Sequence, residues 1–393
     1  MKSKEFYKRH LLDLGLVHQA KFNPYYPVIQ SGLDDQLSIG GQRYIDLASN
    51  NYLGLANDDR LKQAYKNAID KYGASLCATP VASGYSDLHQ LVEKKLSQFV
   101  GLESTIIYPS CYQANNGLFT VIANNEDIAL VDRCAHSSLY EGIKSSGCKI
   151  WPYLHNDLVY IEKILKKSGR HRNIFIVTES VFSTEGTIAP FKNIVDLCEQ
   201  YDAIPIIDDS HGIGVLGDQG KGILEHAGIK DYNGIYTASL GKAWANAGGM
   251  ISGKKSLIDF MKYYSSHLVY STSLLPSVLA GINAVLEIII DEFSALSHQI
   301  WNNKKEITSS LLNAGFNLTE STAPITSIKA GNSLETIQLA KQLYENNILT
   351  TPFIYPSVQQ NEGRIRLIAG ANIKEDSIQK VKEIFMKLKI STE

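Results

Sequence analysis

The sequence predicts an α/β protein in which a mainly parallel central sheet carries helices on both faces and a smaller C-terminal α+β domain follows. Short apolar strands are expected at residues 105–108, 128–131, 174–177 and 204–207, separated by segments in which apolar residues recur at helical spacing. Short buried strands that alternate with helices are typical of parallel sheets. After the apolar stretch from Val278 to Ile290, the pattern changes to alternating strands, which indicates the second domain.

The elements follow this plan from one end of the chain to the other. The prolines of Asn23–Pro27 block a helix and Gly40 and Gly41 favour a turn, so the first fifty residues are predicted to form an arm. Near the C-terminus, residues 325–328 and 364–368 alternate like half-exposed strands, and residues 378–388 are predicted to form a closing amphipathic helix. We expect an N-terminal arm at 1–50, a large domain at 51–285 and a small domain at 286–393.

Composition excludes several classes of function. The 393 residues carry 38 basic and 40 acidic side chains, so a general attraction to nucleic acid or to acidic membranes is not expected. The apolar stretch at 278–290 is interrupted by Asn283 and Glu287 and is too short to cross a bilayer, and the N-terminus lacks the apolar core of a signal peptide. Five widely spaced cysteines without a C-x-x-C pair favour a reduced, cytoplasmic protein over a disulfide framework or a zinc site.

Lys242 is the most informative residue. It follows an apolar strand and lies among small residues that let a flat ring approach the backbone. Another predicted strand ends at Asp208, and His211 comes three residues later, at the edge where α/β sheets place their ligands. An amine, a carboxylate and an imidazole match the needs of pyridoxal phosphate, whose aldehyde bonds to a lysine and whose ring nitrogen is kept protonated by an acid. Spacing alone does not decide between Asp208 and Asp209 for that acid.

Three further segments fit the same cofactor. Residues 108–115 follow a strand and open a helix, which directs backbone N–H groups toward a phosphate. His136 is a candidate to stack on the ring. Arg364 and Arg366 lie on one predicted strand; we expect them to point to opposite faces, one binding a substrate carboxylate and the other facing solvent or a structural carboxylate.

Residues 212–217 match G-x-G-x-x-G, a pattern found at dinucleotide sites. The pattern is separated from its strand, and the polar, glycine-rich stretch after it is unsuited to begin a packed helix. We interpret these glycines as a turn that brings the chain close to the site.

Taken together, the motifs resemble those of the α-oxoamine synthase family of fold-type I pyridoxal phosphate enzymes, which share the aspartate aminotransferase-like fold. The resemblance runs from about Asn50 to Arg366. It rests on six segments in order: NNYLGL at 50–55, SGYSDLH at 83–89, TESVFS at 178–183, DDSHGIGVLG at 208–217, SLGKA at 239–243 and YSTS at 270–273.

The resemblance implies a role for each candidate residue. It makes Lys242 the lysine that bonds to the cofactor, Asp208 the partner of the ring nitrogen, His136 the stacking ring and His211 a hydrogen-bond partner of the phenolic oxygen. Ser183 would lie beside that oxygen. The phosphate site would comprise Ser110, Cys111, Tyr112 and Ser239. Thr272 and Ser273 would reach the phosphate of the other subunit of a homodimer, and Asn50 and Arg366 would bind the amino-acid carboxylate.

The implied reaction joins an amino acid to an acyl thioester of coenzyme A or acyl carrier protein, with loss of carbon dioxide. Within the family, two segments are similar to the branch that uses alanine and pimeloyl thioester in biotin synthesis, while SLGKA is similar to the branch that acylates glycine. Two departures bear on the substrate, because Cys111 replaces a usual glycine and Trp244 is expected to add bulk near the site. An aminotransferase is the alternative enzyme class, since it would share Lys242 and Asp208.

Overall fold

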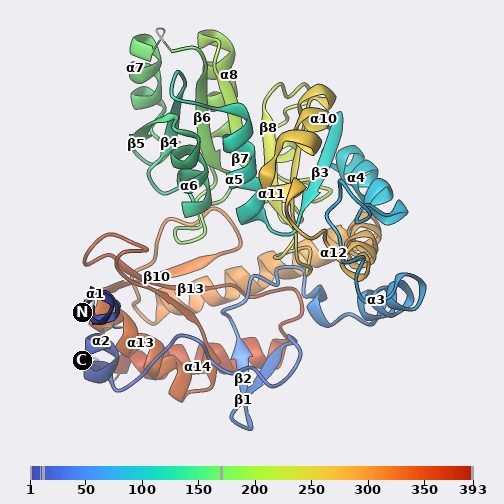
Figure 1. The fold of residues 1–393 in the computed structure, drawn as a ribbon. Coiled ribbons are helices and arrows are strands. Elements are labelled where there is room, and N and C mark those ends of the chain that lie inside the picture. The colour runs from blue at the N-terminus through green and yellow to red at the C-terminus, as the bar shows by residue number, and fades with distance from the viewer. Residues whose placement is uncertain (1, 9, 11–13, 169–170, 391–393) are drawn as a thin grey trace.

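A seven-stranded sheet forms the centre of the larger part of the molecule (Figure 1) in this computed structural model, which describes residues 2–8, 10, 14–168 and 171–390. Across the sheet the order is β3-β9-β8-β7-β6-β4-β5. The strands are β3 (Ser104–Tyr108), β4 (Ile128–Asp132), β5 (Lys149–Tyr153), β6 (Ile174–Glu179), β7 (Ile204–Asp208), β8 (Ile235–Ser239) and β9 (Gly249–Gly253). Within this sheet β9 runs antiparallel to both neighbours and the other pairs are parallel, which confirms the predicted, mainly parallel sheet.

Helices cover both faces of this sheet because side chains alternate along each strand. In β4, Ile128 and Leu130 join one apolar core, and Ala129 and Val131 join the other. The first core contains side chains of α4 (Asp87–Val100), α7 (Leu158–Ser168), α8 (Phe191–Tyr201) and α9 (Ile223–His226). The second contains side chains of α5 (Cys111–Ile122), α6 (Ser137–Ser146), α10 (Lys255–Tyr264) and α11 (Ser266–Val269).

Helix α12 (Pro276–Asn313) runs between the two parts of the molecule (Figure 1) and packs against α3 (Asp59–Tyr72). Pro276 occupies its first turn, where proline needs no hydrogen-bond partner. Val285 packs into the core of the large sheet, whereas Ile307 and Leu311 pack into the C-terminal core. The expected boundary at 285 and 286 falls inside this helix, and the division into domains stays a prediction.

The C-terminal part contains two small sheets. One has the order β10-β13-β12 and is antiparallel; the other has the order β1-β2-β11 and joins the N-terminal arm to the C-terminal part. The strands are β1 (Gln36–Ile39), β2 (Gln42–Asp46), β10 (Thr326–Gly331), β11 (Ile348–Leu349), β12 (Thr351–Phe353) and β13 (Gly363–Leu367). The helices of this region are α1 (Lys2–Lys8), α2 (Gly15–Ala20), α13 (Ser333–Glu345) and α14 (Glu375–Ile390), whereas η1 (Leu55–Asn57) contacts α3 and its Leu55 packs into the core of the large sheet.

The expectation of half-exposed strands in this part is wrong for β13, which is buried along its whole length. Strand β13 lies between β10 and β12, and α13 packs against it. Its apolar residues Ile365 and Leu367 enter the C-terminal core, and the arginines that alternate with them are also buried. Alternation of apolar and charged residues therefore marks two buried faces here.

Two other expectations concern the whole chain. All five cysteines have free thiols. This agrees with the prediction that the cysteines are reduced. In the parts of the chain that the structure describes, no helix combines the length and hydropathy needed to span a membrane.

Candidate active site

The predicted cofactor residues meet at the carboxyl ends of β6, β7 and β8, which lie side by side in the sheet. Strand β7 ends at Asp208, whose Oδ2 accepts a hydrogen bond from Asn115 Nδ2 at 2.8 Å and whose Oδ1 accepts one from the Ser210 backbone N–H at 3.0 Å. Asn115 also donates to Ser138 Oγ at 2.9 Å. These bonds fix the carboxylate and connect β7 to α5 and α6.

His136 is held at the start of α6 by the same network. Its Nδ1 lies 2.8 Å from Ser138 Oγ, and it accepts from the Ser138 backbone N–H at 3.2 Å. Burial lowers the pKa of its imidazole. A neutral ring at this position suits stacking on a flat cofactor, the role that was expected from the sequence.

Lys242 lies in the turn after β8, within the field of Asp208 and Cys111. Burial lowers the pKa of its amine, although the Asp208 carboxylate opposes this change. A larger unprotonated fraction favours bond formation between the amine and an aldehyde.

His211 is buried and its Nδ1 lies 2.9 Å from the hydroxyl of Tyr52. Burial lowers the pKa of His211 well below its usual value, and the positive charge of Lys242 acts in the same direction. The ring is therefore neutral at physiological pH, which leaves one of its nitrogens able to accept a hydrogen bond.

Asp209 serves the glycine-rich turn. Its Oδ2 accepts from the Tyr236 hydroxyl at 2.7 Å and from the Ile223 backbone N–H at 2.9 Å. Side chains at Gly212 or Gly222 would collide with its carboxylate, because a Cβ at either position would lie 1.9 Å from a carboxylate oxygen. Residues 212–217 form turns, as expected, and they enclose Asp209.

A candidate phosphate cradle lies at the N-terminus of α5. Ser110 caps this helix, and its Oγ accepts from the Gln113 backbone N–H at 3.2 Å. Cys111 Sγ lies 3.4 Å from Ser210 Oγ, which accepts from the Ser239 backbone N–H at 2.9 Å. A Cβ at Gly249 would lie 2.3 Å from Cys111 Cα, so the chain passes here without room for a side chain.

The remaining predicted site residues have different surroundings. Ser183 is partly exposed in the turn after β6, Tyr112 is half exposed and Thr272 is exposed, while Ser273 is buried against Gly84. Gln113 Nε2 donates to Ser271 Oγ at 3.2 Å, which places residues 271–273 near the α5 N-terminus of the same chain.

Arg366 is a buried residue whose guanidinium is not fully hydrogen-bonded by the described residues. Its side chain is buried, its Cζ lies 5.0 Å from the centre of the Phe353 ring, and its charge acts on His211 and Lys242. Within the described residues, neither Arg366 Nε nor the buried Asn50 Oδ1 has a hydrogen-bond partner. Such groups are typical of a site whose partner is a ligand.

The expectation that Arg364 and Arg366 point to opposite faces is wrong, because residues two positions apart share a face of a strand. Both are buried. They differ in their partners: Arg364 pairs with Glu185 at 3.4 Å and with Glu362 at 3.6 Å, so it faces structural carboxylates.

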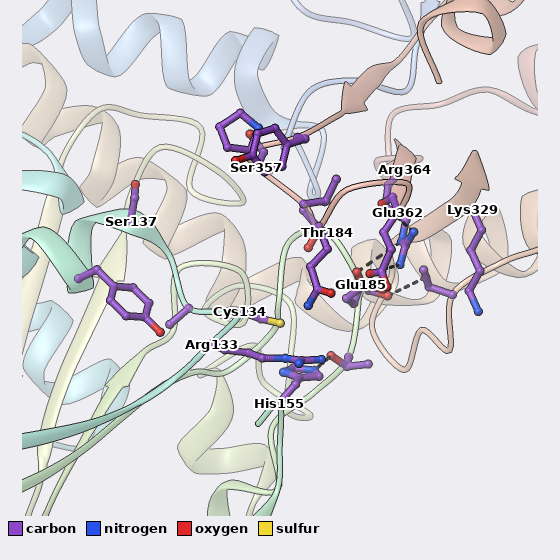
Figure 2. Close-up of a pocket in the computed structure, with 18 of the residues that line it drawn as sticks. Arg133, Cys134, Ser137, His155, Thr184, Glu185, Lys329, Ser357, Glu362 and Arg364 are labelled. Atoms are coloured by element: carbon purple, nitrogen blue, oxygen red, sulfur yellow. Dashed lines mark hydrogen bonds and ion pairs between the residues drawn. The ribbon is translucent and has the colours of Figure 1, made fainter. Parts of the chain in front are cut away.

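An open cavity of about 850 Å³ lies beside these residues. Figure 2 shows Arg133, Cys134 and His155 on one side and Arg364, Glu362 and Lys329 on another, with Glu185 between them. Ala135, Ser137 and Thr184 also line it, and these are the neighbours of His136 and Ser183. The cavity therefore lies next to the segments that carry His136 and Ser183.

Three residues of the site were not predicted from the sequence. Tyr52 and Asn115 position His211 and Asp208, and Glu179 lies opposite Asp208 in the register of β6 and β7. Burial and the Asp208 charge raise the pKa of Glu179 to about 8. Its position at a strand end, as the last residue of an apolar run, was the available signal.

Trp244 lies elsewhere than expected. It is fully buried in the core of the large sheet, where its ring meets Phe99 edge to face at a centroid distance of 5.6 Å. Its bulk therefore fills the core and does not narrow the cavity.

The residues present fit pyridoxal phosphate. The acid, the amine and the two neutral imidazoles lie at one sheet edge, the cradle at Gly249 excludes side chains, and Nε of the buried Arg366 has no hydrogen-bond partner among the described residues. We infer that Ser110, Cys111 and Ser239 would hold the phosphate, and that Asp208 and His136 would hold the ring.

Comparison with known proteins identifies the family of this chain. The family model described as aminotransferase class I and II matches residues 42–385. The 8-amino-7-oxononanoate synthase of Petrotoga mobilis is 35% identical over 88% of this chain and 89% of its own length. The 2-amino-3-ketobutyrate coenzyme A ligase of Salmonella typhimurium is 31% identical over 98% of this chain and 97% of its own.

The structure of serine palmitoyltransferase from Sphingomonas wittichii superposes with a TM-score of 0.92 over 99% of this chain and 97% of its own, at 23% identity, which shows the shared fold. The chain therefore belongs to the aminotransferase class I and II family and, within it, to the α-oxoamine synthases, which depend on pyridoxal phosphate.

Proposed function

We propose that this protein condenses a small amino acid with an acyl thioester to give an α-amino ketone, carbon dioxide and the free thiol. The observation that carries this proposal is the buried Arg366, whose unpartnered guanidinium shares a site with Lys242 and Asp208. A buried cation beside a cofactor lysine is suited to bind the carboxylate of an amino acid.

The bound cofactor supplies an electron-withdrawing ring that stabilises negative charge on the α-carbon of the amino acid. Asp208 would favour this by holding a proton on the ring nitrogen. His136 would cover one face of the ring and exclude water from it. His211, kept oriented by Tyr52, would form a hydrogen bond with the phenolic oxygen beside Ser183.

Lys242 is the group that moves protons. Its amine removes the proton of the α-carbon, which its lowered pKa permits at neutral pH. After the carbon–carbon bond has formed and carbon dioxide has left, the same amine returns a proton to the α-carbon.

Alanine is the favoured amino acid and a pimeloyl thioester the favoured partner, as in 8-amino-7-oxononanoate synthases, which would place the protein in biotin synthesis. The 31% identity to a 2-amino-3-ketobutyrate coenzyme A ligase keeps glycine C-acetyltransferase activity as an alternative. Serine palmitoyltransferase-like activity is a third. The carrier of the acyl thioester is either coenzyme A or acyl carrier protein.

We further propose a cytoplasmic homodimer with shared active sites. Free thiols on all five cysteines support a reducing compartment. The exposed aromatic side chains of Tyr112 and Tyr270 flank the phosphate cradle and the 271–273 segment, and apolar surface at this place is suited to a subunit contact.

The reaction class is tested with alanine labelled in its carboxyl carbon. We expect labelled carbon dioxide in the presence of pimeloyl-coenzyme A and none without a thioester, whereas an aminotransferase would retain the label in a keto acid. Lys242→Ala should release no labelled carbon dioxide.

In the active protein, borohydride reduction followed by peptide mass spectrometry should find the cofactor attached to Lys242. Attachment to another lysine would contradict the assignment.

The two neighbouring acids should have separable effects. Asp208→Asn should bind some cofactor and lose most turnover, because the ring nitrogen loses its carboxylate. Asp209→Asn should mainly lose stability, by about 1–3 kcal/mol, since one buried donor of the turn loses its acceptor. Turnover and urea unfolding measure the two effects.

The pH dependence of stability gives an independent check on Asp209. Burial raises its pKa from 3.8 to about 7, so the folded protein binds more protons than the unfolded chain between those values. Relative to Asp209→Asn, the parent protein should therefore lose stability as the pH rises from about 4 to about 7. If the stability of the parent instead increased relative to Asp209→Asn as the pH rises over this range, the raised pKa of Asp209 would be contradicted.

Arg366→Ala should raise the KM for the amino acid more than tenfold, because losing a buried charge-assisted pair costs about 2–5 kcal/mol. Arg364→Ala is the matched control, since its partners are protein carboxylates. Thermal unfolding identifies variants that fail by misfolding. Equal increases in KM for the two folded variants would refute the special role of Arg366.

Shared sites are tested by mixing two inactive chains. Thr272→Ala should be inactive if its hydroxyl binds the phosphate of the neighbouring subunit, and mixing it with Lys242→Ala should restore activity, because one site of each mixed dimer is then intact. Light scattering and subunit-exchange controls establish that mixed dimers form. Full activity of Thr272→Ala alone would refute the phosphate-binding role of its hydroxyl, and no rescue after exchange of two inactive chains would show that each site is built from one chain.

A further inference from the structure

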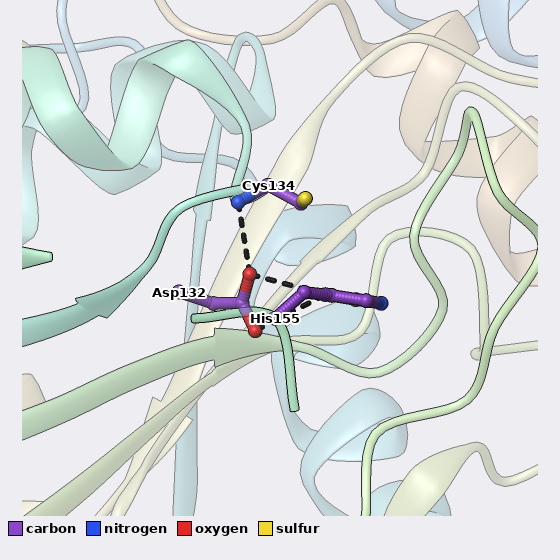
Figure 3. A group of neighbouring side chains, drawn as sticks. All are labelled: Asp132, Cys134 and His155. Atoms are coloured by element: carbon purple, nitrogen blue, oxygen red, sulfur yellow. Dashed lines mark hydrogen bonds and ion pairs between the residues drawn. The ribbon is translucent and has the colours of Figure 1, made fainter. Parts of the chain in front are cut away.

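Asp132, Cys134 and His155 form a cluster of neighbouring side chains (Figure 3), and Cys134 and His155 line the large cavity. Asp132 is the last residue of β4, Cys134 follows two residues later, and His155 lies just after the neighbouring strand β5. One oxygen, sulfur and ring-nitrogen atom from the three residues all lie within 4.8 Å of one another. The cluster is thus built on two adjacent strand ends and not on a free loop.

The geometry of the cluster is fixed by surrounding hydrogen bonds. Asp132 is fully buried and accepts from the backbone N–H groups of Cys134 at 2.8 Å and Asn156 at 2.9 Å. His155 Nδ1 lies 3.1 Å from Asp132 Oδ1, and its Nε2 lies 2.8 Å from Thr187 Oγ1. A second ring nitrogen bonded to a hydroxyl orients the imidazole, as outer partners do at metal sites.

We propose that Cys134, His155 and Asp132 bind a divalent transition metal ion of the Zn²⁺ class. A thiolate, an imidazole and a carboxylate are the ligands that this ion takes, and three protein ligands leave a fourth position for water. Cys134 is exposed and lines the cavity together with His155, so the fourth position opens into the space beside His136. This site lies outside the proposed cofactor chemistry.

The proposal departs from the expectation that the cysteines form no zinc site. That expectation rested on the missing C-x-x-C pair, and it could not take account of ligands of three different types from two separate strands. The three residues, at positions 132, 134 and 155, come together only because β4 and β5 pair in parallel.

The site is tested by titrating the cofactor-loaded protein with Co²⁺, whose tetrahedral complexes absorb in the visible range, at longer wavelength than the cofactor. We expect about one bound ion per chain, displacement by Zn²⁺ and proton release on binding. Cys134→Ser and His155→Gln should each weaken Co²⁺ binding by at least about tenfold. Mutation of residues that only hydrogen-bond to a metal ligand already weakens metal binding by about this factor. Cys77→Ser, which removes another exposed thiol, is the matched control and should bind as the parent does.

Two results would overturn the proposal. The first is absence of saturable Co²⁺ binding in the folded, cofactor-loaded protein. The second is binding that persists unchanged in Cys134→Ser and His155→Gln, which would place the ion on the cofactor or on another part of the surface. Asp132 is left unchanged, because its carboxylate also holds the backbone of two neighbouring segments.

Discussion

The hydrogen bond from Asn115 to Asp208 connects the sheet to the helices that make the site. Asp208 ends the central strand β7, Asn115 lies in the first turns of α5, and Ser138 extends the connection to His136 at the start of α6. A charged carboxylate is stable in this buried place only because donors surround it. This anchored acid therefore links the end of β7 to α5 and to the start of α6, where His136 lies.

The balance of buried charge explains which ligands the site accepts. Arg366 is a buried cation, whereas burial and the Asp208 charge raise the pKa of the neighbouring Glu179 to about 8, which reduces the negative charge of Glu179 at neutral pH. The positive potential of Arg366 favours anions. A substrate carboxylate would supply the matching negative charge, which agrees with the lack of a hydrogen-bond partner for Arg366 Nε among the described residues.

Much of the fold and the core of the site were predictable because they depend on local patterns. Apolar runs identified the strands, and a lysine or an acid at a strand end pointed to the sheet edge. The different surroundings of Asp208 and Asp209 were not predictable, since they follow from which side of the strand faces the helices.

Trp244 illustrates the same limit. This bulky residue, two positions after Lys242, points into the core against Phe99, and only tertiary packing determines its direction. Arg364 and Arg366 share a face, and the difference between them comes from Glu185, a distant residue in the sequence that pairs with Arg364.

The pairing of β2 with β11 has a consequence for how the chain is made. Ile45 and Leu47 pack into a core that is otherwise formed from residues after position 300, and β2 gains its parallel neighbour only at Ile348 and Leu349. A ribosome that adds roughly 5–20 residues per second needs about 15–60 s to make the intervening stretch of about 300 residues. During that time β2 has no β11 to pair with, and its apolar side chains are exposed to chaperones and to other nascent chains. The last steps of folding therefore join the beginning of the polypeptide to its end, after synthesis of nearly the whole chain.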